Sequence, residues 1–268
     1  MSEQISPQRK IWLCRQRRER RVVIWSRMGL LAGFFGLWET AVYFGWIDTF
    51  IMSSPSRAWT AARQMGAALW PHIAVSCAET VAGFLLGTVL GTAAAAALWW
   101  SPRLSRIMEP YLVVLGALPK TALGPIFIVW MGAGVGAILT MALAISLIVT
   151  IMEVYAGFAS VEPEKLRLMQ SLGANRAQTF GMLVLPANLP TMMNALKVNV
   201  GLSWVGVIMG EFLVSKLGLG YLIVYGSQVF KMDLVMATVL ILAAVASAMY
   251  AGMLVLEKII KKHLGVTV

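Results

Sequence analysis

Long apolar runs separated by short polar stretches most constrain what this chain can fold into. A helix of about 20 apolar residues spans the ~30 Å hydrocarbon core of a bilayer, and in lipid only helices and closed barrels satisfy their backbone hydrogen bonds. The composition agrees, with 59% hydrophobic and 13% charged residues. The sequence therefore predicts an all-α, polytopic membrane protein with six transmembrane helices. They lie at about residues 22–46, 73–100, 107–131, 135–155, 193–213 and 234–256.

The basic residues predict how these helices are oriented. Lys and Arg concentrate in residues 1–28 and 257–268, with further Arg and Lys in the loops that follow the second and fourth spans. Loops rich in Lys and Arg stay in the cytoplasm. We therefore expect cytoplasmic N- and C-termini in a multi-pass protein of the bacterial inner membrane. The net charge of +10 is then an orientation signal with some attraction to membrane lipid, and no nucleic-acid partner is expected.

Four segments follow from this pattern. Residues 1–28 form a basic cytoplasmic segment, and residues 29–71 hold the first span and a short helix on the outer surface, for which Ser56 is the expected N-cap. Residues 72–256 form the main transmembrane domain. Residues 257–268 form a basic cytoplasmic tail.

A polar stretch at residues 160–190 interrupts the apolar runs. Apolar residues recur at helical spacing from Pro163 to Leu172, and Gly173 follows as a helix stop. A second short helix is expected from Arg176 to Leu185, ending before Pro186. Two amphipathic helices outside the bilayer leave an apolar face that a partner must cover.

This stretch resembles the cytoplasmic loop of binding-protein-dependent ABC importer permeases with a type I transmembrane domain. The resemblance rests on Gly173 and, at the family's usual interval after it, on Leu183-Val184-Leu185-Pro186. Further motifs are similar to nitrate/sulfonate/taurine-type permeases. These are Ser53-Ser54-Pro55-Ser56, Val81-Ala82-Gly83-Phe84, Pro119 with Pro125, Trp130-Met131-Gly132 and Gly218-Leu219-Gly220-Tyr221-Leu222.

The resemblance implies that the loop holds a coupling helix, which docks on a separate ATPase. The implied contacts are Glu164, Arg167, Leu168, Ser171, Leu172, Gly173 and Ala174. Arg167 stands where the family has an acidic residue, and our hypothesis is that the partner ATPase carries a compensating acid. The chain lacks the G-x-x-x-x-G-K-[ST] phosphate loop and is expected to carry no cofactor of its own. ATP and Mg²⁺ are then bound by two ABC ATPase subunits, which act with a second copy of this permease and an extracytoplasmic solute-binding protein.

Polar groups within the spans are candidates for the translocation pathway, because ionisable residues in a membrane are costly and often functional. Lys120 follows a proline in the broken third span, and Glu211 lies near the end of the fifth. Gly201, Gly206 and Gly210 suit close helix packing, including packing across a two-fold axis. The pathway candidates are Pro119, Lys120, Asn199, Ser203, Trp204 and Glu211.

The sequence thus favours an ATP-driven importer subunit for a small, anionic solute over two alternatives. An ion-coupled secondary transporter would work without an ATPase and would show two related halves, which are not found. An integral-membrane enzyme would need a catalytic cluster or metal-ligand spacing, and the sequence has neither. Nitrate, sulfonate, taurine, bicarbonate and pyrimidine solutes all stay open.

Overall fold

The computed structural model describes residues 7–263, which form helices and no strands. Five helices are long and apolar enough to cross a membrane, and a bent pair makes a sixth span if it is counted as one. The long helices are α1 (Pro7–Tyr43), α4 (Leu69–Trp100), α7 (Val135–Ala159), α11 (Leu189–Val214) and α13 (Met232–His263). The all-α, multi-span prediction is confirmed for this part of the chain.

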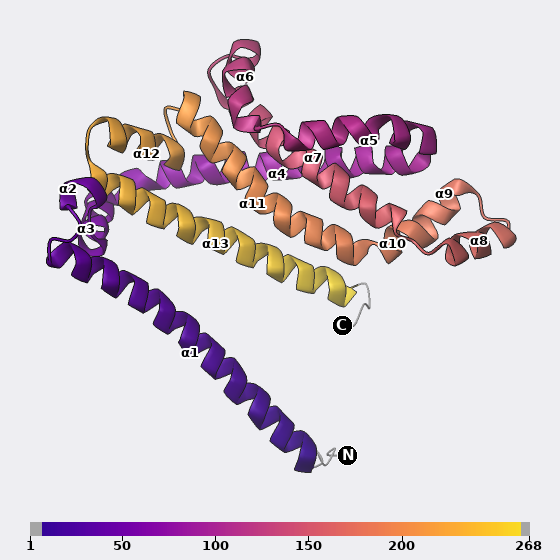
Figure 1. Cartoon of the computed structure of the whole chain (residues 1–268), viewed down its shortest axis with the longest axis horizontal. Helices are drawn as coiled ribbons and strands as arrows, with labels where there is room; N and C mark the ends of the chain where they lie inside the picture. The colour runs from indigo at the N-terminus through magenta and orange to yellow at the C-terminus, as the bar shows by residue number, and fades with distance from the viewer. Residues whose placement is uncertain (1–6, 264–268) are drawn as a thin grey trace.

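The bent pair lies where the third span was expected. It consists of α5 (Pro102–Ala117), the 3₁₀ turn η2 (Lys120–Leu123) and α6 (Gly124–Met131), with an angle of 87° at the break. In Figure 1, α5 lies beside the bundle and α6 points away from it. The break falls at Leu118 and Pro119, because a proline lacks the N–H that would continue the helix and disfavours a helical conformation for the residue before it.

Helices α4, α7 and α11 form the centre of the bundle and approach one another through small residues. Gly83, Gly87 and Gly91 lie one turn apart on α4, and each faces a residue of α7. On α11, a Cβ at Gly206 or Gly210 would come within 2.8 Å of the α7 backbone. Close packing is therefore confirmed for Gly206 and Gly210, within one subunit. The third predicted position, Gly201, has no atom within 4 Å of a Cβ built there.

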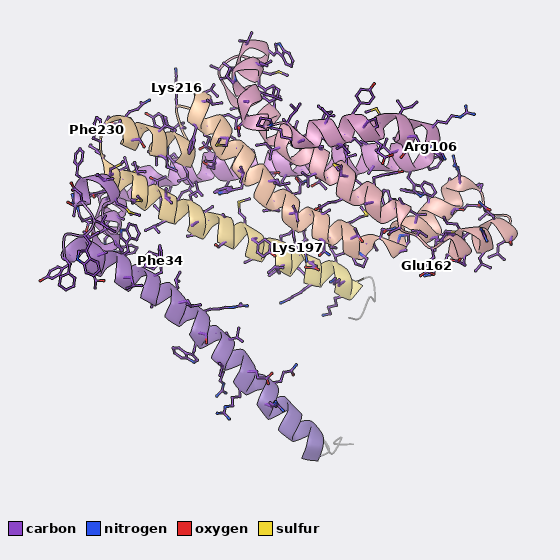
Figure 2. The ribbon with its side chains drawn as sticks, in the orientation of Figure 1. Phe34, Arg106, Glu162, Lys197, Lys216 and Phe230 are labelled. Carbon is purple, nitrogen blue, oxygen red and sulfur yellow. The ribbon has the colours of Figure 1, made fainter. Side chains whose placement is uncertain are left out.

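Helix α1 leaves the bundle as a long rod (Figure 1). Residues 7–28 of the basic segment and the first span belong to this one helix, so the boundary expected at residue 28 lies inside it. The C-terminal end of α1 is attached to the bundle through Glu39, whose carboxylate accepts hydrogen bonds from Ser56 N (3.1 Å) and Ser56 Oγ (2.7 Å). Many of its apolar side chains, including Phe34 (Figure 2), are exposed. Most of the helix therefore has apolar surface that lipid or protein can cover.

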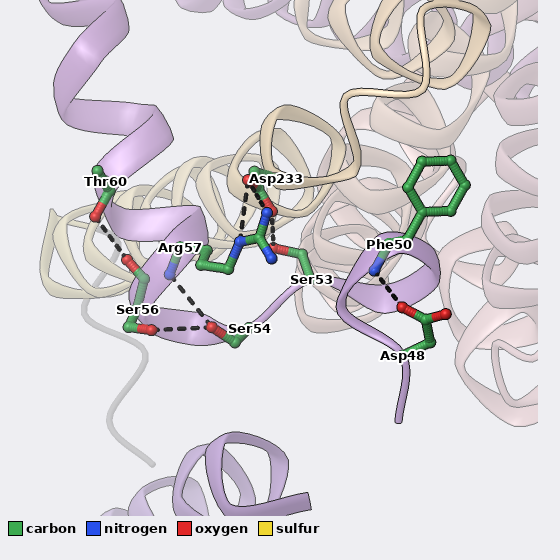
Figure 3. Close-up of polar contacts among 8 residues, drawn as sticks. All are labelled: Asp48, Phe50, Ser53, Ser54, Ser56, Arg57, Thr60 and Asp233. Atoms are coloured by element: carbon green, nitrogen blue, oxygen red, sulfur yellow. Dashed lines mark hydrogen bonds and ion pairs between the residues drawn. The ribbon is translucent and has the colours of Figure 1, made fainter. Parts of the chain in front are cut away.

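Two short helices, α2 (Thr49–Met52) and α3 (Pro55–Met65), follow α1, and η1 (Gly66–Ala68) leads into α4. The short helix expected after the first span is present, but its N-cap is Ser54 and not Ser56. Pro55 takes the first helical position, where its missing N–H costs nothing, and Ser54 Oγ accepts from Arg57 N. Asp233 at the start of α13 ties this region together (Figure 3): it accepts from Ser53 Oγ at 2.6 Å and from the Arg57 guanidinium at 3.1 and 3.2 Å.

An additional helix, α12 (Leu219–Gln228), lies between α11 and α13 and was not expected. It lies with α2 and α3 at one end of the bundle, which we call the α12 end (Figure 1). The opposite end holds α8 (Pro163–Ser171), α9 (Arg176–Thr179) and α10 (Leu185–Ala187), and we call it the α8 end. The start of α1 and the end of α13 both point toward the α8 end.

Candidate functional site

The loop at the α8 end begins with α8, which has Pro163 and Glu164 in its first turn. Gly173 then ends the helix with a φ of +76°, which glycine adopts without strain. The N–H of Gly173 donates to the Gln170 carbonyl (2.9 Å) and the N–H of Ala174 to the Met169 carbonyl (3.0 Å), the pattern of a Schellman cap. The predicted first helix and its glycine stop are confirmed.

The second part of the loop starts with a capping box. Asn175 Oδ1 accepts from Gln178 N at 2.8 Å, and Gln178 Oε1 accepts from Asn175 N at 2.9 Å. The helical backbone then continues through α9, a π-helical turn at Phe180–Val184 (η3) and α10. The expected end before Pro186 is wrong. Pro186 lies in the first turn of α10, where a missing N–H is tolerated.

The predicted ATPase contacts gather on the outside of this loop. Of the seven, Ala174 is half-buried and the other six are exposed. Leu168 and Leu172 keep 59% and 73% of their surface exposed, although both are apolar. Arg167 forms no ion pair with any residue that the structure describes, whereas its neighbour Lys165 pairs with Glu162 at 3.1 Å. Glu162 marks this end of the molecule in Figure 2.

The inside of the loop is packed against the bundle. The ring of Phe180 lies among Trp99 and Trp100 of α4 and Phe158 of α7, with centroid distances of 5.1, 6.1 and 5.3 Å. Arg176 Nη1 donates to the Trp100 carbonyl at 2.6 Å. Sequence reasoning did not select Phe180 or Arg176. The available signal was the pair Trp99-Trp100 at the end of α4.

The predicted pathway residues occupy two places. Asn199, Ser203, Trp204 and Glu211 are all buried on α11, between α4, α7 and α12. Pro119 and Lys120 lie at the break between α5 and α6, where Lys120 Nζ donates to the carbonyl of Gly116 at 2.5 Å. The structure thus brings four of the six together, inside a single subunit.

Polar atoms line the seam between α4, α7 and α11. Asn199 Nδ2 donates to Thr88 Oγ1 at 2.8 Å. Several buried atoms on these helices have no hydrogen-bond partner among the described residues: Asn199 Oδ1, Ser146 Oγ, Ser203 Oγ and Glu79 Oε2. The same holds for Trp204 Nε1, whose ring belongs to a cluster with residues of α12 and α13. Buried polar groups normally find partners, so this seam has hydrogen-bonding capacity left over.

Glu211 joins three helices at the α12 end, and its side chain is only 1% exposed. Its carboxylate accepts from Ser76 Oγ of α4 and from Gly220 N of α12, both at 2.5 Å. Ser76 Oγ in turn accepts from Leu219 N at 2.8 Å. A Cβ on Gly220 would lie 2.7 Å from that of Glu211, so glycine is required for this approach. The carboxylate therefore caps α12 from a neighbouring helix.

Sequence reasoning found Glu211 but missed its partner Ser76 and the helix α12. The glycines at 218 and 220, a few residues after a buried acid, were the available signal. Among the described residues, no group of three or more His, Cys, Asp or Glu side chains could hold a metal ion.

The fold and the double-helix loop define a class of membrane transport subunits, and comparison with known proteins agrees. Residues 87–265 match the family described as binding-protein-dependent transport system inner membrane component, and the chain belongs to this family. It is a permease subunit of an ABC importer and a multi-pass inner-membrane protein, as the loop predicted. This assignment disfavours the secondary transporter and the enzyme.

Several relatives place the chain in the nitrate/sulfonate/taurine type. It is 29% identical over 195 residues to the taurine transport system permease protein TauC of Escherichia coli, covering 72% of this chain and 70% of the relative. It is 25% identical over 232 residues to the putative aliphatic sulfonates transport permease protein SsuC of Escherichia coli, covering 86% and 88%. It is also 29% identical over 150 residues to the formylaminopyrimidine transport permease protein ThiX of Halalkalibacterium halodurans, covering 56% and 60%.

Proposed function

We propose that this permease imports a small anionic solute when two separate ATPase subunits, loaded with ATP and Mg²⁺, bind the exposed face of α8 and close. The observation that carries the proposal is the apolar face itself. Leu168 and Leu172 are exposed beside the polar side chains of Glu164, Arg167 and Ser171, and exposed apolar patches of this kind mark interaction sites. Glu164, Arg167, Ser171, Gly173 and Ala174 complete the contact surface.

The α8 end faces the cytoplasm in this proposal. Basic residues gather there, including Arg103 and Arg106 at the start of α5 and Lys261 near the end of α13. The positive-inside rule favours a cytoplasmic location for such a cluster. A solute-binding protein then delivers the solute to the α12 end.

The full assembly contains two copies of the permease, with the pathway between or within them lined by residues near the seam. The exposed length of α1 supports this arrangement, because a helix that packs on its own bundle only through one end has apolar surface for lipid and for a second copy. The seam offers Asn199 and Ser203 as hydrogen-bonding groups, and Lys120 at the broken span offers a positive charge for an anion.

Similarity to relatives named for taurine and aliphatic sulfonates supports an anionic solute. Sulfonates carry a full negative charge, which a lysine attracts. Similarity to the relative named for formylaminopyrimidine supports a neutral heterocycle as the alternative class of solute.

Reconstitution tests the proposal. The permease would be co-expressed with its cognate ATPase and solute-binding protein, purified, and placed in liposomes with ATP inside. We expect solute uptake that requires both partners and ATP hydrolysis, with a non-hydrolysable ATP analogue as the control. Uptake by the permease alone, driven by an ion gradient, would contradict the proposal.

A further inference from the structure

The coupling face on α8 has only a limited direct connection to the membrane helices. A cavity of about 350 Å³ lies between α8 and the corner where α4 meets α5. Leu166 and Gln170 of α8 line it on one side, and Leu98, Trp99 and Pro102 line it on the other. Its remaining lining comes from Tyr155 of α7 and from Ala174, Arg176 and Thr179 after the glycine stop. Leu166 also packs against the cluster that contains Ala95 of α4 and Phe158 of α7, so α8 reaches the bundle through this side chain.

The segment after Gly173 is connected much more firmly. Arg176, Phe180 and Val184 are spaced four residues apart, so they lie along one side of the helical run formed by α9 and η3. All three contact the bundle, whereas Met182 in the same turn is 73% exposed. The inner side of this run is therefore a continuous row of contacts.

Arg176 forms a hydrogen bond with the C-terminal end of α4. The last carbonyls of a helix have no partner within the helix, and the Arg176 guanidinium donates to one of them, at Trp100, over 2.6 Å. A cation at a helix C-terminus is also favoured by the helix dipole. Because of this bond, a displacement of α9 would act directly on the end of α4.

Phe180 and Val184 extend the connection to α7 and α11. The Phe180 ring lies against Trp99 of α4 and Phe158 of α7, and Phe158 is fully buried. Val184 is fully buried too, in a cluster with Ala95 of α4, Phe158 and Ala195 of α11. Close-packed interiors transmit displacement because they hardly compress.

We propose that Arg176, Phe180 and Val184 form a transmission row that converts movement of α8 into movement of α4 and α7. They are positioning residues and touch neither ATP nor solute. The π-helical turn fixes their alignment, and such turns are frequent at functional sites. The inference rests on the proposed function, because it assumes that α8 is where the ATPase binds.

The test separates docking from transmission. Arg176→Ala and Phe180→Ala would be compared with the wild type in the reconstituted complex by three measurements: the ATPase that copurifies, the rate of ATP hydrolysis, and the solute taken up per ATP. We expect unchanged copurification, continued hydrolysis, and about a tenfold loss in solute per ATP, as for losing a hydrogen bond to a charged group. Arg176→Lys keeps a donor for the Trp100 carbonyl and should restore most of the ratio.

Ile151→Ala is the matched control, because Ile151 is buried in a neighbouring cluster with Leu98 and Leu112 and lies outside the row. It should lower thermal stability and leave the ratio of solute to ATP unchanged. Because Arg176 is exposed, its variants are expected to fold even if Phe180→Ala does not. An unchanged ratio in Arg176→Ala, or an equal loss in Ile151→Ala, would overturn the transmission row. If the wild-type permease retains no ATPase, the proposed function fails and this inference fails with it.

Discussion

The two ends of the bundle are built in different ways. At the α12 end, polar side chains bond distant segments to one another: Glu211 and Ser76 hold α12, and Asp233 holds the start of α13 to α3. At the α8 end, the loop keeps Leu168 and Leu172 exposed and has a cavity beneath its first helix. The bonds at the α12 end hold this chain's own segments together, whereas the exposed apolar side chains of α8 are available to a partner.

This difference separates residues that stabilise the permease from residues that bind a partner. Substitutions at the α12 end should lower the stability of the permease itself, because they break bonds within one chain. Substitutions on the exposed face of α8 should leave the permease stable and change only what it binds. The following predictions test that division, from the largest expected effect to the smallest.

Replacing Glu211 with alanine should have the largest effect. It leaves Ser76 Oγ and Gly220 N without their acceptor in a buried site, and each unsatisfied group costs about 1–3 kcal/mol, so the permease should lose about 2–6 kcal/mol. Thermal unfolding of the purified protein in detergent measures this loss. A melting temperature equal to that of the wild type would show that the carboxylate does not hold α12.

Gly206→Val should destabilise the packing of α11 on α7 by about 1–3 kcal/mol, the usual cost of overpacking a core. A Cβ at Gly206 meets the Ala142 backbone, which cannot rotate away. Gly201→Val on the same helix is the control, because open space surrounds its Cβ position. Equal melting temperatures for the two variants would contradict the close approach of α11 to α7.

Ser76→Ala should loosen α12 by about 1–3 kcal/mol, since Leu219 N loses its acceptor. Cys77 reports the change, because this half-buried thiol packs against the cluster that contains Leu219. In a Cys14→Ser background, Cys77 is the remaining cysteine, and a maleimide should label it faster in the Ser76→Ala variant. Ser203→Ala is the control: its buried hydroxyl has no described partner, so labelling should stay at the starting rate.

Separating Arg57 from Asp233 should have the smallest effect. Their ion pair at 3.1 Å is partly exposed, and such pairs contribute about 0–1 kcal/mol. A double-mutant cycle with Arg57→Ala and Asp233→Asn measures the coupling energy. A value well above that range would mean that the ion pair, and not Ser53, anchors the start of α13.

The sequence predicted best what depends on local pattern. The helical spacing before Gly173 predicted α8, and the apolar runs predicted the spans, because both signals lie within about 20 adjacent residues. The N-cap of α3 was misplaced by two residues, since Pro55 fixed the first helical position more strongly than the serine after it. Pro186 was read as a helix end although a proline also fits a first turn.

The contacts of Glu211 were out of reach of the sequence. Its bond to Ser76 joins residues 135 positions apart. With 10 residues, α12 is also too short for its sequence pattern to distinguish it from the connection between two spans. Phe180 has the same difficulty, because its role depends on two tryptophans from another helix. Such contacts become visible only once helix packing is known.

Copurification of the ATPase with an α8 variant tests the central claim most directly. Leu172→Asp places a charge on the exposed coupling face, while Gln170→Ala changes the opposite side of the same helix, since two residues turn an α-helix by roughly 200°. We predict that Leu172→Asp loses the ATPase and ATP-driven uptake at an unchanged permease melting temperature, and that Gln170→Ala keeps both. An ATPase that still copurifies in full with Leu172→Asp would contradict the claim.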